Sequence, residues 1–313
     1  MTGDTAREGT VLRAQSGHCR ILDDTGRTWH ALLRGRLKSG PRLARTVVAA
    51  GDRVRFRPVD AAAGEAVLEE VLPRRNRISR RTTRRDRGRR EHVLMANLDR
   101  VIVVQSVARP APVPGFVDRL LAAAEQHAVP AAVCVHKSDL DPDAAADPAW
   151  DWYAGLGYRV LRTSTVTGEG VDAFRELLVG STSIVLGASG TGKSSLIAAA
   201  TGLELRVGEV TARTGLGRHT TTHTELYPVP GGGFIADSPG LRGFDLWGVE
   251  PREIQALMPD IAREAAGCRF HSCLHVAEPD CAVRAAVDAG RLPAWRYRAY
   301  RRLLAEAEEH RRP

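Results

Sequence analysis

The chain has 313 residues, and its 43% hydrophobic content is normal for packed globular domains, of which this length suggests two or three. No apolar run approaches the ~20 residues that span a bilayer, and the first ten residues lack the apolar core of a signal peptide. We therefore expect a cytoplasmic protein with reduced thiols that does not contact a membrane.

The basic character of the chain is confined to one segment. Residues 74–90 hold ten arginines and one aspartate, a local charge of +9 in a chain whose net charge is +8. This distribution predicts a polyanion contacted by one arm, because arginine suits bidentate phosphate contact. The alternative is a solvated linker without a partner. In either case we expect a mobile loop or linker, which becomes ordered when it binds a partner.

Short, partly alternating apolar runs separated by turn-like stretches fill residues 9–72. The runs lie at residues 10–12, 19–22, 29–33, 54–59 and 66–72. This spacing predicts a small β-barrel of five strands. An oligonucleotide-binding (OB) barrel, whose open face often contacts RNA, fits the pattern. Composition alone does not distinguish it from an SH3-like barrel.

From residue 97 onward, apolar strands alternate with helices. Strands are predicted at 101–104, 131–135, 159–161, 184–186, 224–229 and 234–236, and helices at 117–128 and 171–178. The alternation implies a parallel sheet with helices on both faces and ligands beyond the carboxyl ends of the strands. After Gly240 the pattern is helical, with helices predicted at 251–257 and 293–310. Arg296, Arg298, Arg301 and Arg302 make the last helix partly basic, which ordinary surface would also explain.

These patterns divide the chain into four predicted regions. They are an RNA-binding OB barrel (1–75), an arginine-rich linker (76–95), an α/β nucleotide domain (96–245) and a helical metal-binding domain (246–313).

The strand at 184–186 leads into a glycine-rich turn and a helix. The turn matches the phosphate-loop pattern G-x-x-x-x-G-K-[ST]. Lys193 supplies a positive charge to the β- and γ-phosphates, and the Ser194 hydroxyl can bind Mg²⁺. Glycine lets successive N–H groups surround a phosphate, which also faces the positive end of the helix. The residues expected around the phosphates are Gly187, Ser189, Gly190, Thr191, Gly192, Lys193, Ser194 and Ser195.

Two further segments predict contacts with Mg²⁺ and the γ-phosphate. Asp237 and Gly240 form a D-x-x-G motif directly after the strand at 234–236. In nucleotide hydrolases, the aspartate acts through Mg²⁺ or its water and the glycine amide senses the γ-phosphate. The segment 215–226, GLGRHTTTHTEL, has the composition of a switch loop, in which Thr220 and Thr221 offer hydroxyls. We expect Thr221 to bind Mg²⁺ together with Ser194.

The base is expected to contact the segment His136-Lys137-Ser138-Asp139, which follows the strand at 131–135. This segment resembles the guanine motif N-K-x-D. In that motif the aspartate accepts two hydrogen bonds that adenine cannot donate, and the lysine stem packs on the base. His136 replaces the asparagine, so some bracing contacts are lost while Asp139 keeps the larger discrimination. Ser164, in the loop after the strand at 159–161, is expected to contact the guanine as well.

Three of the five cysteines fall within residues 268–281. Cys268, Cys273, His275 and Cys281 offer three thiolates and an imidazole, a reasonable tetrahedral Zn²⁺ set. His271 is a rival for the histidine position. Four protein ligands leave no open position, so we expect a structural zinc ion.

Taken together, these residues resemble the circularly permuted GTPases that act on the small ribosomal subunit, the RsgA/YjeQ family. The motifs that carry the resemblance are GASGTGKSSL, GRHTTT, DSPG, the pair Lys137 and Asp139, TGEG at 167–170, and C-x4-C-x-H-x5-C. The base-reading elements precede the phosphate loop, which is the permuted order.

The resemblance implies a monomeric GTPase that is slow alone and stimulated by the small (30S) ribosomal subunit. It implies a role in late maturation of that subunit near the decoding region, with the barrel and the zinc module on rRNA. At the matching positions, family members bind zinc through Cys268, Cys273, His275 and Cys281.

The residue after D-x-x-G is Leu241, which cannot orient the attacking water as the glutamine of many GTPases does. We expect His219 to orient the water, and the resemblance supports this role for the switch histidine. Lys193, which neutralises the phosphates, is expected to be the second catalytic residue. Two alternatives are an ATPase or kinase of the same fold, which Asp139 disfavours, and an RNA-binding protein with a vestigial nucleotide site, which Lys193, Ser194 and Asp237 disfavour.

Overall fold

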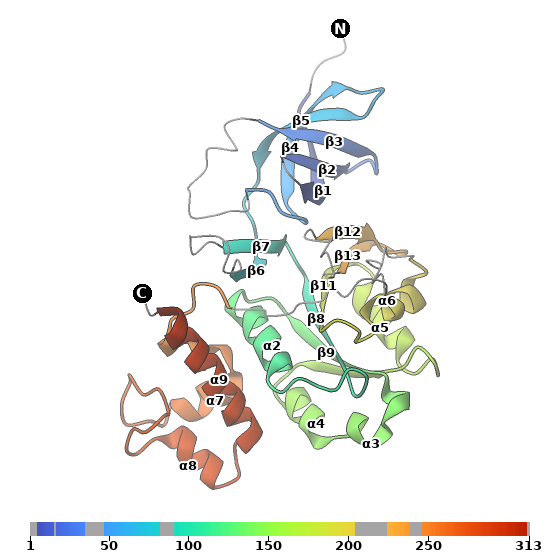
Figure 1. The fold of residues 1–313 in the computed structure, drawn as a ribbon. Helices are drawn as coiled ribbons and strands as arrows, with labels where there is room; N and C mark the ends of the chain where they lie inside the picture. Colours follow the sequence, from blue (N-terminus) through green and yellow to red (C-terminus); the bar gives the residue numbers. More distant parts are fainter. Residues whose placement is uncertain are drawn as a thin grey trace, which may run out of the picture.

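The structure is a computed structural model that describes residues 5–15, 17–34, 47–81, 91–203, 224–237 and 246–311. A β-barrel, an α/β sheet and a group of C-terminal helices follow one another along the chain (Figure 1). Within the described ranges, no helix combines the length and the apolar character needed to cross a membrane.

Five strands form the barrel. They are β1 (Arg7–Gln15), β2 (His18–Asp23), β3 (Thr28–Leu33), β4 (Arg53–Asp60) and β5 (Glu65–Val71). The strand order is β1-β2-β3-β5-β4, and β1 pairs with β4 to close the barrel. Alternate side chains fill the interior, as Trp29 and Ala31 do on β3. The five-stranded barrel is confirmed, and its Greek-key order is that of an OB fold.

The arginine-rich segment is only partly a loop. Strand β6 (Arg77–Arg81) pairs antiparallel with β7 (Glu91–Ala96), and Ile78 of β6 is fully buried. The expectation of a mobile linker is therefore wrong for Arg77–Arg81. The sequence gives little sign of this strand, because Ile78 is its only large apolar residue and arginines surround it. Residues 82–90 lie outside the described part of the chain.

The α/β sheet has the predicted parallel core. Its strands are β8 (Arg100–Ser106), β9 (Ala131–His136), β10 (Arg159–Thr163), β11 (Ser181–Leu186), β12 (Glu225–Pro228) and β13 (Gly233–Asp237). Their order is β10-β9-β8-β11-β13-β12, and only β12 runs antiparallel to its neighbour β13. Strands buried on both faces read as continuous apolar runs, as AAVCV does in β9.

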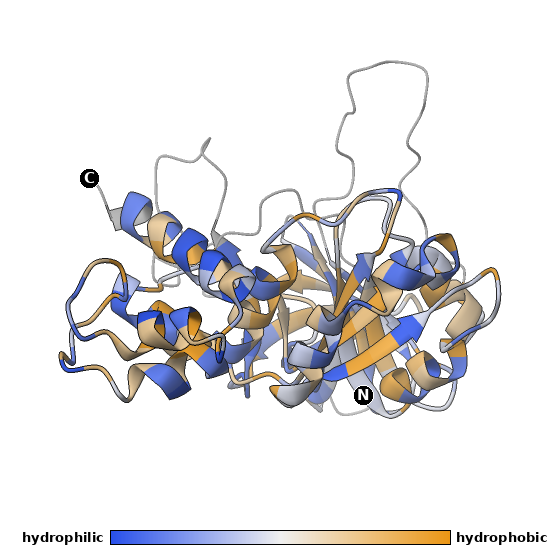
Figure 2. Ribbon diagram, turned by 90° about the horizontal axis from the view of Figure 1, so that it is seen from below, coloured by the Kyte–Doolittle hydropathy of each residue, from blue (hydrophilic) through white to orange (hydrophobic). Residues whose placement is uncertain are grey.

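Helices cover both faces of this sheet, as predicted, and the apolar residues concentrate on the strands between them (Figure 2). The helical elements of this region are α2 (Phe116–Gln126), the short 3₁₀ helix η1 (Ser138–Leu140), α3 (Pro142–Ala145), α4 (Pro148–Gly155), α5 (Val171–Leu178) and α6 (Lys193–Thr201). Val101 and Val103 of β8 face the side of α2, whereas Ile102 and Val104 face α5 and α6. One strand thus contributes to two cores.

The barrel and the α/β sheet are joined. Arg13 of β1 pairs with Glu225 of β12, so the two form one eleven-stranded sheet. This joint brings together residues that are 212 positions apart. The sequence patterns did not predict it, because pairing across such a distance has no local signal.

The C-terminal helices are η2 (Pro251–Leu257), α7 (Pro259–Ala265), α8 (Ala282–Asp288) and α9 (Ala294–Arg311). The helix predicted at 251–257 is a 3₁₀ helix. Arg296 of α9 is buried, and its guanidinium pairs with Asp118 on α2 and, at 2.7 Å, with Asp260 on α7. The ordinary-surface explanation is therefore wrong for Arg296, while Arg298 is exposed.

Candidate functional site

The phosphate loop joins β11 to α6 at the carboxyl edge of the sheet. Its lysine is almost buried, and the Lys193 ammonium donates to the carbonyls of Gly187 and Ala188, both at 3.0 Å. Thr191 closes the loop by donating from its hydroxyl to the Ala188 carbonyl at 2.9 Å. A Cβ on Gly187 would lie 2.5 Å from the Val104 carbonyl. The loop is therefore tightly folded, and only glycine fits at its first position.

The base loop lies against the phosphate loop. Lys137, with a positive φ of 61°, donates from its ammonium to the Gly190 carbonyl at 2.8 Å and to the Arg109 carbonyl. Asp139 follows in η1, and its carboxylate accepts a 2.5 Å hydrogen bond from the Ser164 hydroxyl at the end of β10. The structure thus brings together Lys137, Asp139, Ser164 and the phosphate loop, which the sequence had placed in three separate segments.

His136 packs against both the end of β10 and the phosphate loop. The side chain is buried, and its Nδ1 lies 2.9 Å from the Thr163 hydroxyl and 3.2 Å from the Thr163 carbonyl. The opposite edge of the ring faces Gly192, where an added Cβ would approach the ring to 2.7 Å. Burial lowers the pKa of His136, which favours the neutral imidazole.

Glu169 is a site residue that the sequence patterns did not single out. Its carboxylate accepts from the Ser138 hydroxyl at 2.5 Å, and its carbonyl accepts from the Ser164 N–H at 3.0 Å. It therefore ties the base loop to the loop after β10. Its place within TGEG was the available indication, but nothing in that pattern shows where the carboxylate points.

The switch elements are only partly described. The backbone of Asp237 ends β13 opposite Val185 of β11, two residues before Gly187. This register puts the start of the D-x-x-G motif beside the phosphate loop. The residues His219, Thr220, Thr221, Gly240 and Leu241 lie outside the described part of the chain.

The predicted metal ligands converge at the C-terminal domain. One ligand atom from each of Cys268, Cys273, His275 and Cys281 lies within 4.8 Å of every other. The Cys268 and Cys281 sulfurs are 3.9 Å apart, and the His275 Nδ1 lies 3.5 and 3.4 Å from them. Tetrahedral ligands of zinc would be separated by about 3.8 Å between sulfurs and about 3.5 Å between sulfur and nitrogen. The cluster therefore fits a zinc ion.

The surroundings of this cluster orient its histidine. Gln255 of η2 lies 2.8 Å from the His275 Nε2, which leaves Nδ1 facing the three sulfurs. The Tyr297 hydroxyl donates to the His275 carbonyl at 2.6 Å. Burial raises the pKa of the Cys273 thiol to about 12, so a cation is what would hold a thiolate there. His271 is exposed and outside the cluster.

The chain resembles known proteins over nearly its whole length. Residues 71–247 match a family model described as RsgA GTPase. The small ribosomal subunit biogenesis GTPase RsgA of Gemmatimonas aurantiaca is 39% identical over 304 residues, which cover 96% of this chain and 98% of that protein. The protein of the same name from Moorella thermoacetica is 40% identical over 300 residues, covering 96% and 97%.

Two solved structures share the fold. YjeQ from Thermotoga maritima has a TM-score of 0.76 at 29% identity, covering 98% of this chain and 100% of that one. YloQ, described as a circularly permuted GTPase, has a TM-score of 0.72 at 25% identity, covering 99% and 97%.

Proposed function

The chain belongs to the RsgA GTPase family and is a GTP hydrolase, and from this premise we propose that it acts in late maturation of the small ribosomal subunit near the decoding region. The names of its relatives, which refer to biogenesis of that subunit, support this role. We propose that the 30S subunit stimulates an otherwise slow hydrolysis, and that the protein acts as a cytoplasmic monomer.

The observation that carries the assignment is the contact between the base loop and the phosphate loop. Lys137 bonds to Gly190, and His136 packs on Gly192, so one nucleotide can touch both loops at once. We assign guanine recognition to Asp139, held by Ser164, with the stem of Lys137 against the base. Lys193 would neutralise the β- and γ-phosphates. The remaining loop residues expected at the phosphates are Gly187, Ser189, Thr191, Ser194 and Ser195.

Magnesium fits the same edge of the sheet. We assign its ligands to the hydroxyls of Ser194 and Thr221, with Asp237 acting directly or through a water and Thr220 beside them. When bound, the ion neutralises charge on the β- and γ-phosphates. The register of β13 beside β11 supports this assignment, because it places Asp237 next to the strand that leads into the phosphate loop.

We assign orientation of the attacking water to His219, because Leu241 offers no polar atom for that purpose. His219→Ala should lower kcat by roughly 100-fold with little change in GTP affinity, because the side chain would act only on the water. Steady-state phosphate release at saturating GTP with 30S subunits present measures kcat, and equilibrium titration measures affinity. Near-wild-type turnover in this variant would contradict the assignment.

The zinc ion is assigned a structural role, because four protein side chains complete its coordination. Elemental analysis of the purified protein should give one zinc per chain. We propose that this module, the barrel and the arginines of residues 74–90 contact rRNA.

One assay tests the function as a whole. Phosphate release is measured with GTP and with ATP, each with and without purified 30S subunits and with 50S subunits as the control. We expect phosphate release from GTP but not from ATP. The 30S subunits should increase the rate of release, and the 50S subunits should leave it unchanged. Hydrolysis of ATP would contradict the base assignment, and equal rates with both subunits would contradict the proposed partner.

A further inference from the structure

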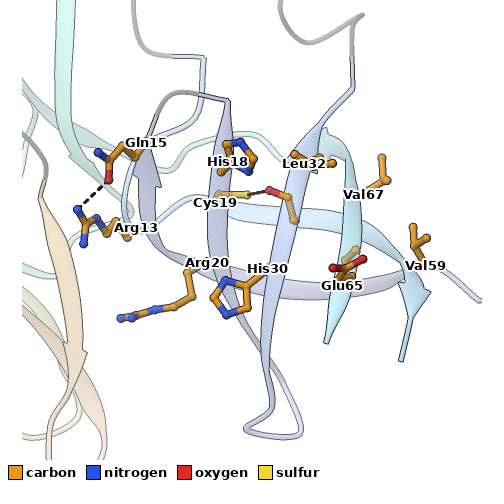
Figure 3. Close-up of a pocket in the computed structure, with 12 residues that line it drawn as sticks. Arg13, Gln15, His18, Cys19, Arg20, His30, Leu32, Val59, Glu65 and Val67 are labelled. Carbon is orange, nitrogen blue, oxygen red and sulfur yellow. Dashed lines mark hydrogen bonds between the residues drawn. The ribbon is translucent and has the colours of Figure 1, made fainter. Parts of the chain in front are cut away.

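A row of polar and charged side chains runs from the α/β sheet into the barrel. It follows the cross-strand register from β12 to β5: Glu225, Arg13, Arg20, His30 and Glu65. Residues directly opposite each other in a sheet project from the same face. The last four line a hollow of about 480 Å³ on the barrel, where they lie on successive strands (Figure 3). The first, Glu225, belongs to the nucleotide-binding sheet.

Glu225 holds two arginines that would otherwise repel each other. Arg13 and Arg20 are directly opposite on β1 and β2, an arrangement that is unfavourable for like charges. The Glu225 carboxylate accepts from the Arg20 Nη2 at 2.5 Å and from the Arg13 Nη1 at 3.4 Å. Its side chain is 19% exposed, against 40% for Arg13 and 37% for Arg20. One carboxylate thus compensates two guanidinium groups at the edge of the hollow.

The other arginines paired on the barrel are compensated locally. Within the described residues, five of them pair with carboxylates of the barrel itself: Arg7, Arg34, Arg53, Arg55 and Arg57. Arg13 and Arg20 differ, because their carboxylate comes from outside the barrel. If Glu225 moved away, the barrel would present two adjacent positive charges that no barrel carboxylate among the described residues neutralises.

The chemistry of the hollow fits single-stranded RNA. His18 and His30 offer rings on which bases can stack, and Leu32 and Val59 are 53% and 64% exposed beside them. The buried Nε of Arg20 has no hydrogen-bond partner in the described part of the chain. Arginines beside stacking surfaces are typical of grooves that follow a single-stranded backbone.

We propose that Glu225 competes with RNA phosphate for Arg13 and Arg20, so that RNA bound to the barrel displaces a carboxylate of the nucleotide-binding sheet. The proposal rests on the proposed function in one respect, namely that the barrel contacts rRNA. Glu225 is also the cross-strand neighbour of Asp237 on β13. Displacement of Glu225 would therefore perturb β12 next to Asp237, the residue that we assign to magnesium. If RNA binding changes nucleotide affinity in this way, nucleotide binding changes RNA affinity by the same factor.

The test compares two substitutions that change the net charge equally. Glu225→Gln releases Arg13 and Arg20, whereas Glu70→Gln removes one of the two carboxylates that pair with Arg55, which does not line the hollow. Binding of a fluorescein-labelled 12-nucleotide oligouridine to the full chain is followed by anisotropy at several salt concentrations. We expect E225Q to tighten binding roughly three- to tenfold and to steepen the log–log salt slope by about one unit, as for one or two added phosphate contacts. E70Q should match wild type within about twofold.

Two further variants guard against a trivial result. Glu225→Asp keeps the charge but withdraws the carboxylate by one methylene, so it should also tighten binding. Arg20→Gln should remove most of the gain when combined with E225Q. Equal effects of E225Q and E70Q, weaker binding by folded E225Q or E225D, or no binding by any variant would each overturn the proposal. The assay contains neither GTP nor ATP, so its failure is distinct from failure of the GTPase assay.

Discussion

At the scale of single residues, His136 shows how a departure from a motif is accommodated. The imidazole is engaged on one side by Thr163 and lies against Gly192 on the other. It therefore connects the base loop, the end of β10 and the phosphate loop without needing to contact the guanine. We assign guanine discrimination to Asp139, whose carboxylate accepts a hydrogen bond from the Ser164 hydroxyl.

His136→Ala should weaken GTP and GDP binding equally, by roughly tenfold or about 1.4 kcal/mol, because both nucleotides need the two loops in register. The preference for GTP over ATP should persist. His136→Asn, which restores a polar side chain, should recover most of the loss. Calorimetric titration with the three nucleotides measures these effects.

Cys134→Ala is the matched control for this prediction. Cys134 is also buried on β9 and lies 3.0 Å from the Thr163 hydroxyl, but it is absent from the contacts of Gly192. Its nucleotide affinities should stay within about twofold of wild type. If H136A and C134A behaved alike, or if H136A bound ATP, the bracing role would be wrong.

At the scale of elements, the first arginines of the arginine-rich segment form ion pairs within the fold. Arg74 makes a bidentate ion pair with Asp52, in which Nε donates to Oδ1 at 2.7 Å and Nη2 donates to Oδ2 at 2.8 Å. The Asp52 carboxylate is fully buried. Arg77 pairs with Glu91 across the hairpin. These arginines stabilise the junction of the barrel and β6, so their charge is partly committed within the fold.

Arg74→Gln should lower the free energy of unfolding by about 2–3 kcal/mol, because it leaves a buried carboxylate without its cation. Arg75→Gln is the control, since its pair with Asp99 is exposed and should cost less than about 1 kcal/mol. Chemical denaturation measures both.

Substituting the arginines within residues 82–90 should instead weaken 30S binding and flatten its salt dependence, and unchanged salt dependence would contradict a binding role for that stretch.

At the scale of the whole molecule, one buried cation holds the C-terminal helices to the α/β sheet. Arg296 lies between Asp118 and Asp260, and Trp152 and Tyr153 of α4 bond to the same two carboxylates. The carboxylates come from α2 and α7, so the cluster spans both parts. A buried network of this kind constrains their relative orientation.

Arg296→Ala should destabilise the protein by about 3–5 kcal/mol, because two buried carboxylates lose their cation. Arg298→Ala, at an exposed position of the same helix, should have an effect below about 0.5 kcal/mol. Thermal and denaturant unfolding measure both. The triple variant R296M/D118N/D260N should recover much of the loss, and a triple variant as unstable as R296A would show that the cost is packing rather than charge.

What could be predicted from sequence follows the range of the interactions involved. The barrel strands, the parallel core and the phosphate loop depend on local alternation, apolar runs and glycine spacing. The metal set was predictable because its ligands lie within 14 residues. The burial of Arg296, the joint of β1 with β12 and the bracing by His136 each depend on partners far along the chain, which no local pattern encodes.

The joint between β1 and β12 also has a consequence for synthesis of the chain. The barrel strands lie within the first 71 residues, but the partner of Arg13 lies 212 positions later. At about 5–20 residues per second, the ribosome needs roughly 10–40 s to deliver that partner. During this interval β1 is paired with β2 and, over Arg7–Thr10, with β4, but its end near Arg13 lacks its neighbour on the β12 side. A strand end of this kind can pair with other chains. A nascent chain released before residue 225 would therefore be more prone to aggregate than the finished protein.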